Sequence, residues 1–377
     1  MEGGSLTRAY AVVSAEVLQT ECFGEKLIRC EVRVPGIEGT TQALNYVDLT
    51  GEVYAGDRVL MNTTAVDLGL GSGGFHFIMC GERMEGPLSE GPGHIMKLRY
   101  TPWQMRTLAI EEEASPHHSQ LVDAESLDGM PVICIELHSQ LLPVIAGIRS
   151  ANSHLKITYV MTDGGSLPMQ LSATVTQLKS ADWLLATISA GNSFGGDWEA
   201  VNTYSALVAA RRALGADVAV VGIGPGIVGT GTLWGHTGLQ QAQVANAVVT
   251  LGGRGVLPVR VARDDSRDRH RGISHHSLTV LSRAVMGEVW VVMPRELSRR
   301  WHLWRQLLGE GICRRHRLVS ERADEAIELL RRDSAWEQWR RLLRHMGRSF
   351  DQEPDFFLAA CAAGRWAGTL VQKGGEG

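Results

Sequence analysis

The first 115 residues alternate apolar and polar positions in short runs that predict β-strands. Loop-forming residues interrupt these runs at PGIEG, residues 35–39, and at LGSGG, residues 70–74. Gly51 and Gly56 permit tight corners in the segment LTGEVYAGDRVL. We therefore predict a small β-barrel-like domain over residues 1–115. Its expected strands lie within residues 9–17, 27–34, 41–49, 57–66 and 75–80.

Beyond residue 130 the pattern changes to apolar runs that alternate with amphipathic segments. This alternation predicts an α/β domain with a doubly wound, mostly parallel sheet, because parallel strands need helical crossovers. We expect this domain to cover residues 131–370, and the proline-containing residues 116–130 to form a linker. A helix is expected over residues 139–152 despite Pro143. The expected strands are PVICIEL, LKITYVM, DWLLATIS, DVAVVG, VLPVRVA and EVWVVMP.

The C-terminal region carries an excess of arginine, with fourteen arginines against eight acids between Arg295 and Arg348. In AWEQWRRLLRHM the tryptophans and leucines recur three to four positions apart, which favours a packed apolar stripe with a solvated arginine face. The chain has a formal charge of −4 and no recognised nucleic-acid motif. We therefore expect no nucleic-acid partner.

Cysteine usage and hydropathy favour a cytoplasmic protein. The six cysteines show no CxxC pair, and Cys134 lies inside an apolar run, so free buried thiols are expected. The start MEGGSLTRAY lacks the apolar core of a secretory signal. Residues 218–235 carry no charge, but six glycines and Pro225 argue against a membrane span there. We expect no membrane contact.

In a doubly wound sheet, ligands bind in the loops that follow the carboxyl ends of the strands. Here these loops are polar and glycine-rich, whereas the helix-to-strand connections LGAD and LGGRG are short. Asp163, Asn192 and Asp197 follow two of the expected strands and are candidate ligand contacts. Asp197 and Glu199 have a simpler interpretation as acids in the first turn of a helix, where the dipole favours them.

The segment GIGPGIVGTGTLWGHTG, residues 222–238, contains seven glycines. Glycine backbones let consecutive amides approach an anion, so we predict an anion-binding loop; a purely structural glycine loop is the alternative. The motif G-x-G-x-x-G is present, but no acid follows about twenty residues later, so NAD is not expected. The helix is expected to start near Thr237 as its cap. The predicted ligand-binding residues are Gly224, Gly226, Gly229, Thr230, Gly231, Thr232 and Thr237.

The segment RDDSRDRHRGISHH, residues 263–276, concentrates four arginines, three aspartates and three histidines. Such a density of titratable groups points to catalysis or ligand contact, or to an arginine–aspartate network that braces the loop. Ser274 is expected to cap the next helix, which places His275 and His276 in its first turn, where the dipole favours neutral imidazole. Candidate catalytic residues are Asp264, His270, His275, His276 and, from the glycine-rich loop, His236; Arg271 is a candidate ligand contact.

A divalent metal is a further candidate for this segment. Asp264, Asp265, Asp268 and His270 could share an ion with His275 and His276, although no known metal-ligand spacing is satisfied. The sequence therefore leaves the cofactor open.

Four segments resemble a bacterial family of conserved proteins that is known only as a domain of unknown function. They are GPGIVGTGT, AGNSFGGDWEAVN, AVDLGLGSGGFHF and RHRGISHHS. The resemblance runs from near the N-terminus to about residue 295 and implies a two-part architecture. It implies no activity and no catalytic residue.

Three functions remain open at this stage. The leading hypothesis is an enzyme that acts by hydrolysis or group transfer on a small anionic molecule, phosphorylated or nucleotide-like. The second is a metabolite-binding or regulatory module without turnover. The third is a structural oligomer whose glycine loops pack against a neighbouring subunit. A homodimer is expected only from the frequency of two-fold assemblies.

Overall fold

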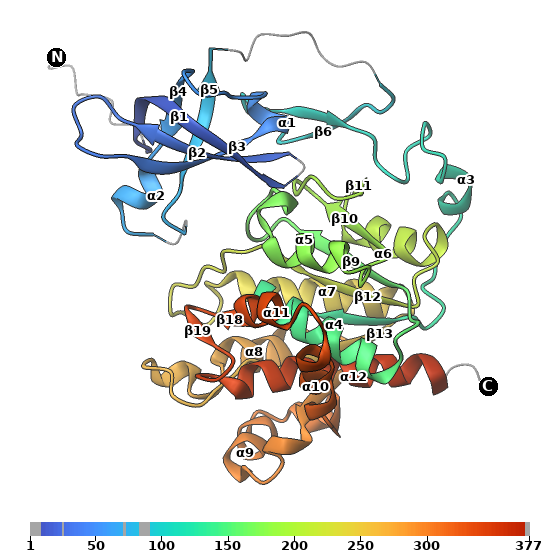
Figure 1. Cartoon of the computed structure of the whole chain (residues 1–377). Coiled ribbons are helices and arrows are strands. Elements are labelled where there is room, and N and C mark those ends of the chain that lie inside the picture. The colour runs from blue at the N-terminus through green and yellow to red at the C-terminus, as the bar shows by residue number, and fades with distance from the viewer. Residues whose placement is uncertain (1–8, 25, 71–72, 83–90, 374–377) are drawn as a thin grey trace, which may run out of the picture. The chain divides into compact units, whose positions relative to one another are not determined.

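The computed structural model describes residues 9–24, 26–70, 73–82 and 91–373. The chain forms two compact units, one of residues 1–91 with 100–105 and one of residues 92–99 with 106–377 (Figure 1). Gly71 and Ser72 of the predicted LGSGG break lie outside the described residues, as does most of the segment MEGGSLTRAY.

The N-terminal unit contains a closed five-stranded β-barrel, as the strand pattern predicts. Strand β1 pairs antiparallel with β2 and with β4, and β3 pairs parallel with β5. Alternate residues of the strands, among them Val17, Val32 and Met61, fill the interior. Gly56 has a φ of +93°, which the tight corner requires. The barrel strands are β1 (Val12–Gly24), β2 (Leu27–Arg33), β3 (Thr41–Tyr46), β4 (Arg58–Asn62) and β5 (His76–Gly81), with short helices α1 (Val47–Thr50) and α2 (Thr64–Asp67).

The second unit is built on an eight-stranded sheet in the order β11-β10-β9-β12-β8-β13-β16-β17. Every pairing in it is parallel, so the predicted doubly wound sheet is confirmed. The strands are β8 (Pro131–Cys134), β9 (Ile157–Thr162), β10 (Ala186–Ala190), β11 (Trp198–Ala200), β12 (Val218–Ile223), β13 (Arg254–Pro258), β16 (Trp290–Pro294) and β17 (Arg317–Glu321).

Helices cover both faces of this sheet and enclose two separate apolar cores. One face is covered by α4 (Leu141–Ala151), α5 (Ala173–Ser180), α10 (Asp324–Arg332), α11 (Trp336–Leu342) and α12 (Pro354–Lys373). The other is covered by α6 (Thr203–Arg212), α7 (Gln240–Thr250), α8 (His275–Thr279) with the π-helical turn Val280–Ala284, and α9 (Trp301–Gly309). Pro143 is the third residue of α4, where a missing amide proton costs no helical hydrogen bond.

Shorter elements complete the description. They are β6 (Ile95–Lys97) with β7 (Met105–Thr107), helix α3 (His118–Leu121), the ribbon β14 (Val261–Ala262) with β15 (Gly272–Ile273), and the ribbon β18 (Arg344–His345) with β19 (Arg348–Ser349). None of the described helices combines the length and the apolar composition that a membrane crossing demands.

Helices α4 and α12 pack with their backbones in contact. A Cβ atom added at Gly364 of α12 would overlap the carbonyl oxygen of Val144, and one added at Gly147 of α4 would overlap that of Cys361. Glycine is needed at both positions because of this close approach, not because of backbone conformation.

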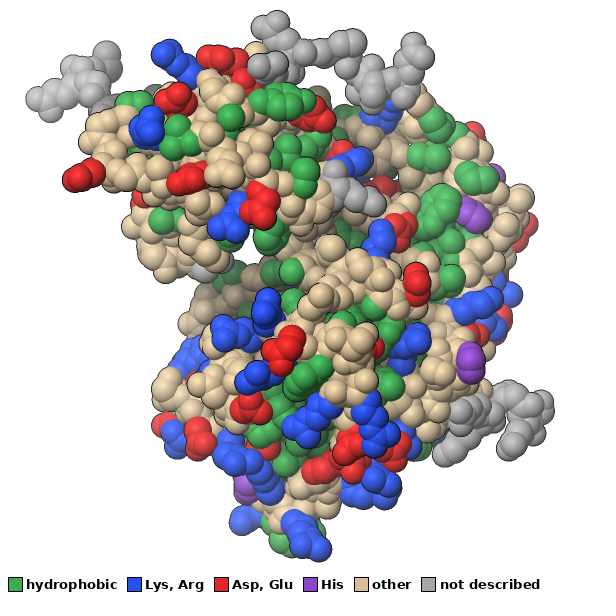
Figure 2. All heavy atoms as spheres, in the orientation of Figure 1, with side chains coloured by type: hydrophobic (Ala, Val, Ile, Leu, Met, Phe, Trp, Pro, Cys, Tyr) green, Lys and Arg blue, Asp and Glu red, His purple; other side chains and the backbone are tan. Residues whose placement is uncertain are grey.

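Arginines of the C-terminal region, on α10 and just before it, pair with acids of this helix. Arg332 lies 2.6 Å from Glu328, and Arg322 lies 2.9 Å from Asp324. Figure 2 shows basic and acidic side chains intermingled rather than gathered into one basic field.

Two edge strands depart from the expectations. Glu199 does not lie in the first turn of a helix: Trp198–Ala200 form edge strand β11, and α6 begins at Thr203. Residues 317–321, within the arginine-rich region, form the opposite edge strand β17. Both strands have mostly half-buried side chains, so neither has the apolar pattern of a central strand.

Candidate functional site

The connections of the sheet define a switch point between β8 and β13. The chain leaves β8 through α4 toward β9 on one side, and leaves β13 through α8 toward β16 on the other. Ligand sites of open parallel sheets form at the carboxyl ends of strands where the connections diverge in this way. Glu136 follows β8 and the 263–276 segment follows β13, and the two meet where Glu136 lies 3.4 Å from His276.

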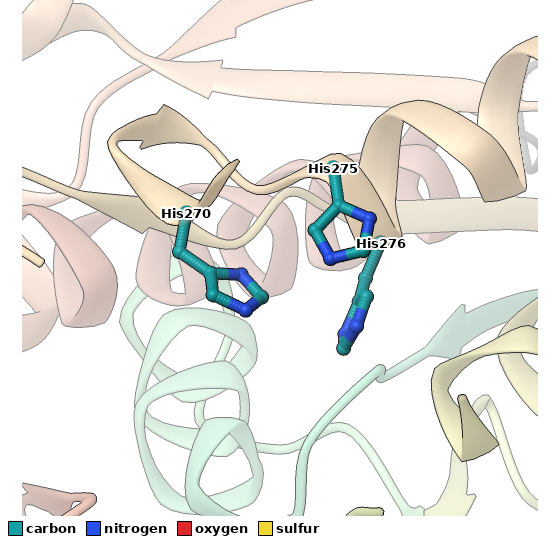
Figure 3. A group of neighbouring side chains, drawn as sticks. All are labelled: His270, His275 and His276. Atoms are coloured by element: carbon teal, nitrogen blue, oxygen red, sulfur yellow. The ribbon is translucent and has the colours of Figure 1, made fainter. Parts of the chain in front are cut away.

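Three histidines of that segment form a compact cluster (Figure 3). His270 lies in a short 3₁₀ turn, and His275 and His276 occupy the first turn of α8. The ring centroids of His275 and His276 are 4.3 Å apart, and that of His270 lies 4.9 Å from His275 and 5.0 Å from His276. The structure therefore brings together three of the predicted catalytic histidines.

Ser274 organises this turn. Its hydroxyl accepts a hydrogen bond from the His276 amide, so it caps α8 as expected. The same hydroxyl lies 2.8 Å from His270 Nδ1. One serine therefore fixes both the start of the helix and the orientation of a cluster ring.

Glu136 is the buried carboxylate of the site. Its Oε1 lies 3.4 Å from His276 Nδ1, and its Oε2 accepts a 2.6 Å hydrogen bond from the Ser277 hydroxyl. Burial alone would raise the pKa of Glu136, but His276, Arg260 and Ser277 together lower it. The carboxylate is therefore held charged beside His276.

Burial keeps the neighbouring imidazoles neutral. It lowers the pKa of His270 to about 3, with a further contribution from the charge of Arg260, and it lowers the pKa of His275 to about 4. Burial also lowers the pKa of His236. Neutral imidazole can accept a proton or bind a metal, so His270 and His275 are in the form that either chemistry needs.

The glycine-rich loop reaches this cluster through His236. The rings of His236 and His276 stack with centroids 3.8 Å apart and planes 3° from parallel. A Cβ added at Gly229 would lie 3.3 Å from the His276 ring, and one at Gly238 would lie 3.0 Å from His236 Nδ1. At these two positions, glycine allows the loop to approach the histidines closely.

The tip of the loop is exposed and internally hydrogen-bonded. Gly229 and His236 form an antiparallel bridge, and the Thr230 amide donates to the Gly235 carbonyl. The Thr230 and Thr232 hydroxyls lie 3.0 Å apart. Thr237 does not cap α7: its hydroxyl accepts from the Val228 amide, and a 3₁₀ turn precedes Gln240. The exposed residues at the tip include Gly226, Gly229, Thr230, Gly231 and Thr232, whereas Gly224 is buried.

Of the other predicted ligand contacts, Asp163 and Asn192 follow the carboxyl ends of their strands, whereas Asp197 does not lie at this edge. Asp163 accepts a 3.0 Å hydrogen bond from the Asn192 amide, and the Ser166 amide donates to the Pro225 carbonyl at the start of the glycine-rich loop. Asp197 accepts from the Thr187 amide and hydroxyl and pairs with Lys179. Thr187 is near the amino end of β10, so Asp197 braces the opposite end of the sheet.

The aspartates of the 263–276 segment differ in burial and in their partners. Asp264 is exposed, whereas Asp265 is buried and bonds Arg267 at 3.0 Å and Arg348 at 3.4 Å. An arginine–aspartate network therefore braces this segment, as one of the two sequence interpretations proposed. The histidines are additional to the network and do not form its ion pairs.

Arg271 lines a cavity of about 820 Å³ beside the same segment. Arg263 and Arg300 also line it, and both pair with the buried Asp355, Arg263 at 3.3 Å. Arg271 is exposed and pairs with the exposed Asp268 at 3.2 Å. The cavity thus presents several guanidinium groups whose charge is only partly neutralised.

Sequence reasoning missed Glu136 as a site residue, because it was included in the strand PVICIEL. The strand ends at Cys134, so Glu136 already belongs to the loop at the carboxyl edge. The sequence signal that points to Glu136 is a single acid directly after the apolar run PVICI. Both ring nitrogens of His138, in the same loop, have partners within the fold. Nε2 lies 2.6 Å from the Ser172 hydroxyl, and Nδ1 lies 3.2 Å from the Tyr159 hydroxyl.

The fold and this site define an α/β protein that carries a cluster of two buried histidines and one half-buried histidine at the switch point of a parallel sheet. The chain belongs to the family described as Protein of unknown function (DUF3866), whose profile matches residues 42–364. No curated protein matches the chain.

Proposed function

We propose that this protein is an enzyme that hydrolyses, or transfers a group from, a small anionic molecule at the switch point between β8 and β13. The stacking of His236 on His276 carries the proposal, because it joins the glycine-rich loop to the histidine cluster beside Glu136. Sites on parallel sheets form where such loops converge.

The charges around the cluster favour an anion. Arg269 lies over the glycine-rich loop, its guanidinium carbon 3.8 Å from where a Cβ of Gly231 would be. Arg271 lines the adjacent cavity. Guanidinium groups bind phosphate and carboxylate through paired, charge-assisted hydrogen bonds. A neutral imidazole beside such an anion is suited to removing a proton from water or from an attacking hydroxyl.

His275 is the residue best placed for such proton transfer. It is the least buried ring of the cluster, and its Nε2 has no hydrogen-bond partner among the described residues. His270 and His276 each direct one ring nitrogen at Ser274 or Glu136, whereas the structure gives His275 no such orienting partner among the described residues.

A turnover screen tests the proposal. The wild-type protein is assayed with phosphomonoesters, phosphodiesters, nucleoside triphosphates and carboxylate esters, and binding of the best compound is measured by calorimetry. His275→Ala should lose at least about 100-fold in kcat, as expected for a general base, while retaining binding. His154→Ala, on an exposed histidine, is the matched control. Binding without turnover in every class would identify a binding module instead.

A further inference from the structure

We propose that His270, His275 and His276 form a binding site for a divalent transition metal, with Zn²⁺ as the best-suited ion. Each histidine offers one ring nitrogen, and these three nitrogens lie within 4.8 Å of one another. The inference concerns metal binding by this chain and does not require that the proposed enzymatic function be correct.

The spacing is close to that of a bound ion. Zinc–imidazole bonds of about 2.0–2.1 Å in a tetrahedron place the nitrogens about 3.3 Å apart. Three nitrogens within 4.8 Å of one another need shifts of less than about 1 Å to reach that arrangement. Rotation of the imidazole rings about their side-chain bonds supplies such a shift without moving the backbone of α8.

Each ring has a nitrogen left over for the ion. His270 Nδ1 contacts the Ser274 hydroxyl, which leaves Nε2. His276 Nδ1 faces Glu136, which also leaves Nε2. His275 Nε2 is buried without a hydrogen-bond partner among the described residues. A buried polar atom without a partner is costly, and a bound ion at this point would satisfy it.

The surroundings match those of known histidine–metal sites. A ligating histidine usually gives its other ring nitrogen to a carboxylate, a carbonyl or another oxygen, which fixes the tautomer and the ring. Glu136 takes this position behind His276, and Ser274 takes it behind His270. Glu136 and Ser274 are therefore positioning residues, which act on the ion through the rings they orient.

The donor set selects the class of ion. Three imidazoles suit zinc and its first-row neighbours, whereas calcium and magnesium require oxygen ligands. Three protein ligands leave a position for water, which is the arrangement of catalytic rather than structural zinc sites. When bound, the ion would occupy His275 Nε2, and an acidified water on the ion would then replace proton removal by His275.

The principal alternative is a cluster of stacked histidines without an ion. His236 stacks on His276, and this contact needs no metal. Stacking alone gives no reason for the three nitrogens to converge, so metal affinity separates the two interpretations.

The test uses Zn²⁺ itself. The full-length protein is stripped with a chelator, and Zn²⁺ is titrated in competition with a chromophoric chelator. A single tight site per chain is expected, and X-ray absorption of the zinc form should show imidazole scattering. His275→Ala should weaken binding by more than about 100-fold, beyond what loss of a supporting residue causes. His154→Ala should bind as the wild type does. Circular dichroism of the stripped proteins shows whether each variant is folded.

Two results would overturn the site. One is a wild-type protein that takes up no Zn²⁺, Co²⁺, Ni²⁺ or Mn²⁺ at micromolar concentration. The other is zinc uptake that persists in a folded His275→Ala variant, or a zinc form of the wild type that shows no imidazole scattering. The scattering is measured on the wild type, so it remains decisive even if the variant does not fold. Tight binding without turnover in the substrate screen would contradict only the proposed function. Turnover by a protein that takes up none of these ions would contradict only the site.

Discussion

The imidazole rings of His236 and His276 lie face to face, 3.8 Å apart and 3° from parallel. One residue belongs to the glycine-rich loop after β12, and the other to the first turn of α8. Their contact joins two segments that are not paired with each other as β-strands.

Replacing Glu136 by Gln should weaken zinc binding by about 10- to 100-fold, because the charge behind His276 Nδ1 is lost. The amide retains an oxygen that can accept from Ser277, so the loop should remain folded. Competition titration measures the affinity, and the visible spectrum of the Co²⁺ form reports the ligand geometry. Glu288→Gln, on an exposed acid paired with Arg317, should change neither. An unchanged affinity would show that Glu136 does not support the ion.

Replacing Gly229 by Ala should displace the His276 ring by a few tenths of an ångström, because the added Cβ would lie 3.3 Å from it. We expect zinc affinity to fall several-fold and the unfolding free energy to change by less than about 1 kcal/mol. Titration and urea unfolding measure the two quantities. Gly309→Ala is the control, since nothing lies within 4 Å of its added Cβ. Equal affinities in the two variants would indicate that the loop yields instead of the ring.

Replacing His345 by Phe should reduce the loss of stability in acid. Burial, followed by the charges of Arg260 and Arg348, lowers the pKa of His345 to about 3. The unfolded chain takes up the proton near pH 6.5 and the folded chain does not, so protonation favours unfolding as pH falls from about 6.5 to about 3. The Phe variant lacks this term.

The loss of unfolding free energy between pH 7 and pH 4 should therefore be about 3 kcal/mol smaller in His345→Phe than in the wild type. Urea unfolding at both pH values measures it. The variant also loses the contact between the Ser139 hydroxyl and His345 Nδ1, which is 3.1 Å long. This loss changes the unfolding free energy equally at both pH values, so it cancels from the difference. Parallel curves for the wild type and His345→Phe would show that His345 is protonated in the folded protein.

Replacing Gly364 by Ala should destabilise the second unit by about 1–3 kcal/mol or more, because the methyl group would overlap the Val144 carbonyl and separate α12 from α4. Higher helix propensity of alanine offsets at most about 1 kcal/mol of this cost. Denaturant midpoints measure the change, with Gly309→Ala again as the comparison. A more stable Gly364→Ala would mean that the two helices can separate at little cost.

The central strands could be predicted from the sequence because they are buried on both faces. Strands β8, β9 and β12 consist entirely of buried residues, so each forms an unbroken run of apolar or small residues. The two edge strands, β11 and β17, were not predicted because most of their side chains are only partly buried. Because all strands of this sheet are parallel, the polar and glycine-rich loops that follow them lie at the same edge, that of the carboxyl ends.

The candidate site could be predicted only in part. The density of charge in residues 263–276 identified the segment, and Ser274 capping placed His275 and His276 correctly. The burial of Asp265 rather than Asp264 depends on Arg348, which lies far along the chain. The role of Glu136 depends in the same way on Ser277. Contacts between distant segments leave no mark in the local pattern.

Helix α12 (Pro354–Lys373) is the last helix of the described chain, yet Phe356, Phe357 and Ala360 lie in one core with Ile133 of β8. During synthesis, α4 and the central strands leave the ribosome well before this helix. The face of the sheet that carries α4 therefore lacks this part of its cover on the nascent chain until α12 emerges. The second unit can complete its fold only after α12 has been made, although its first strand is made early.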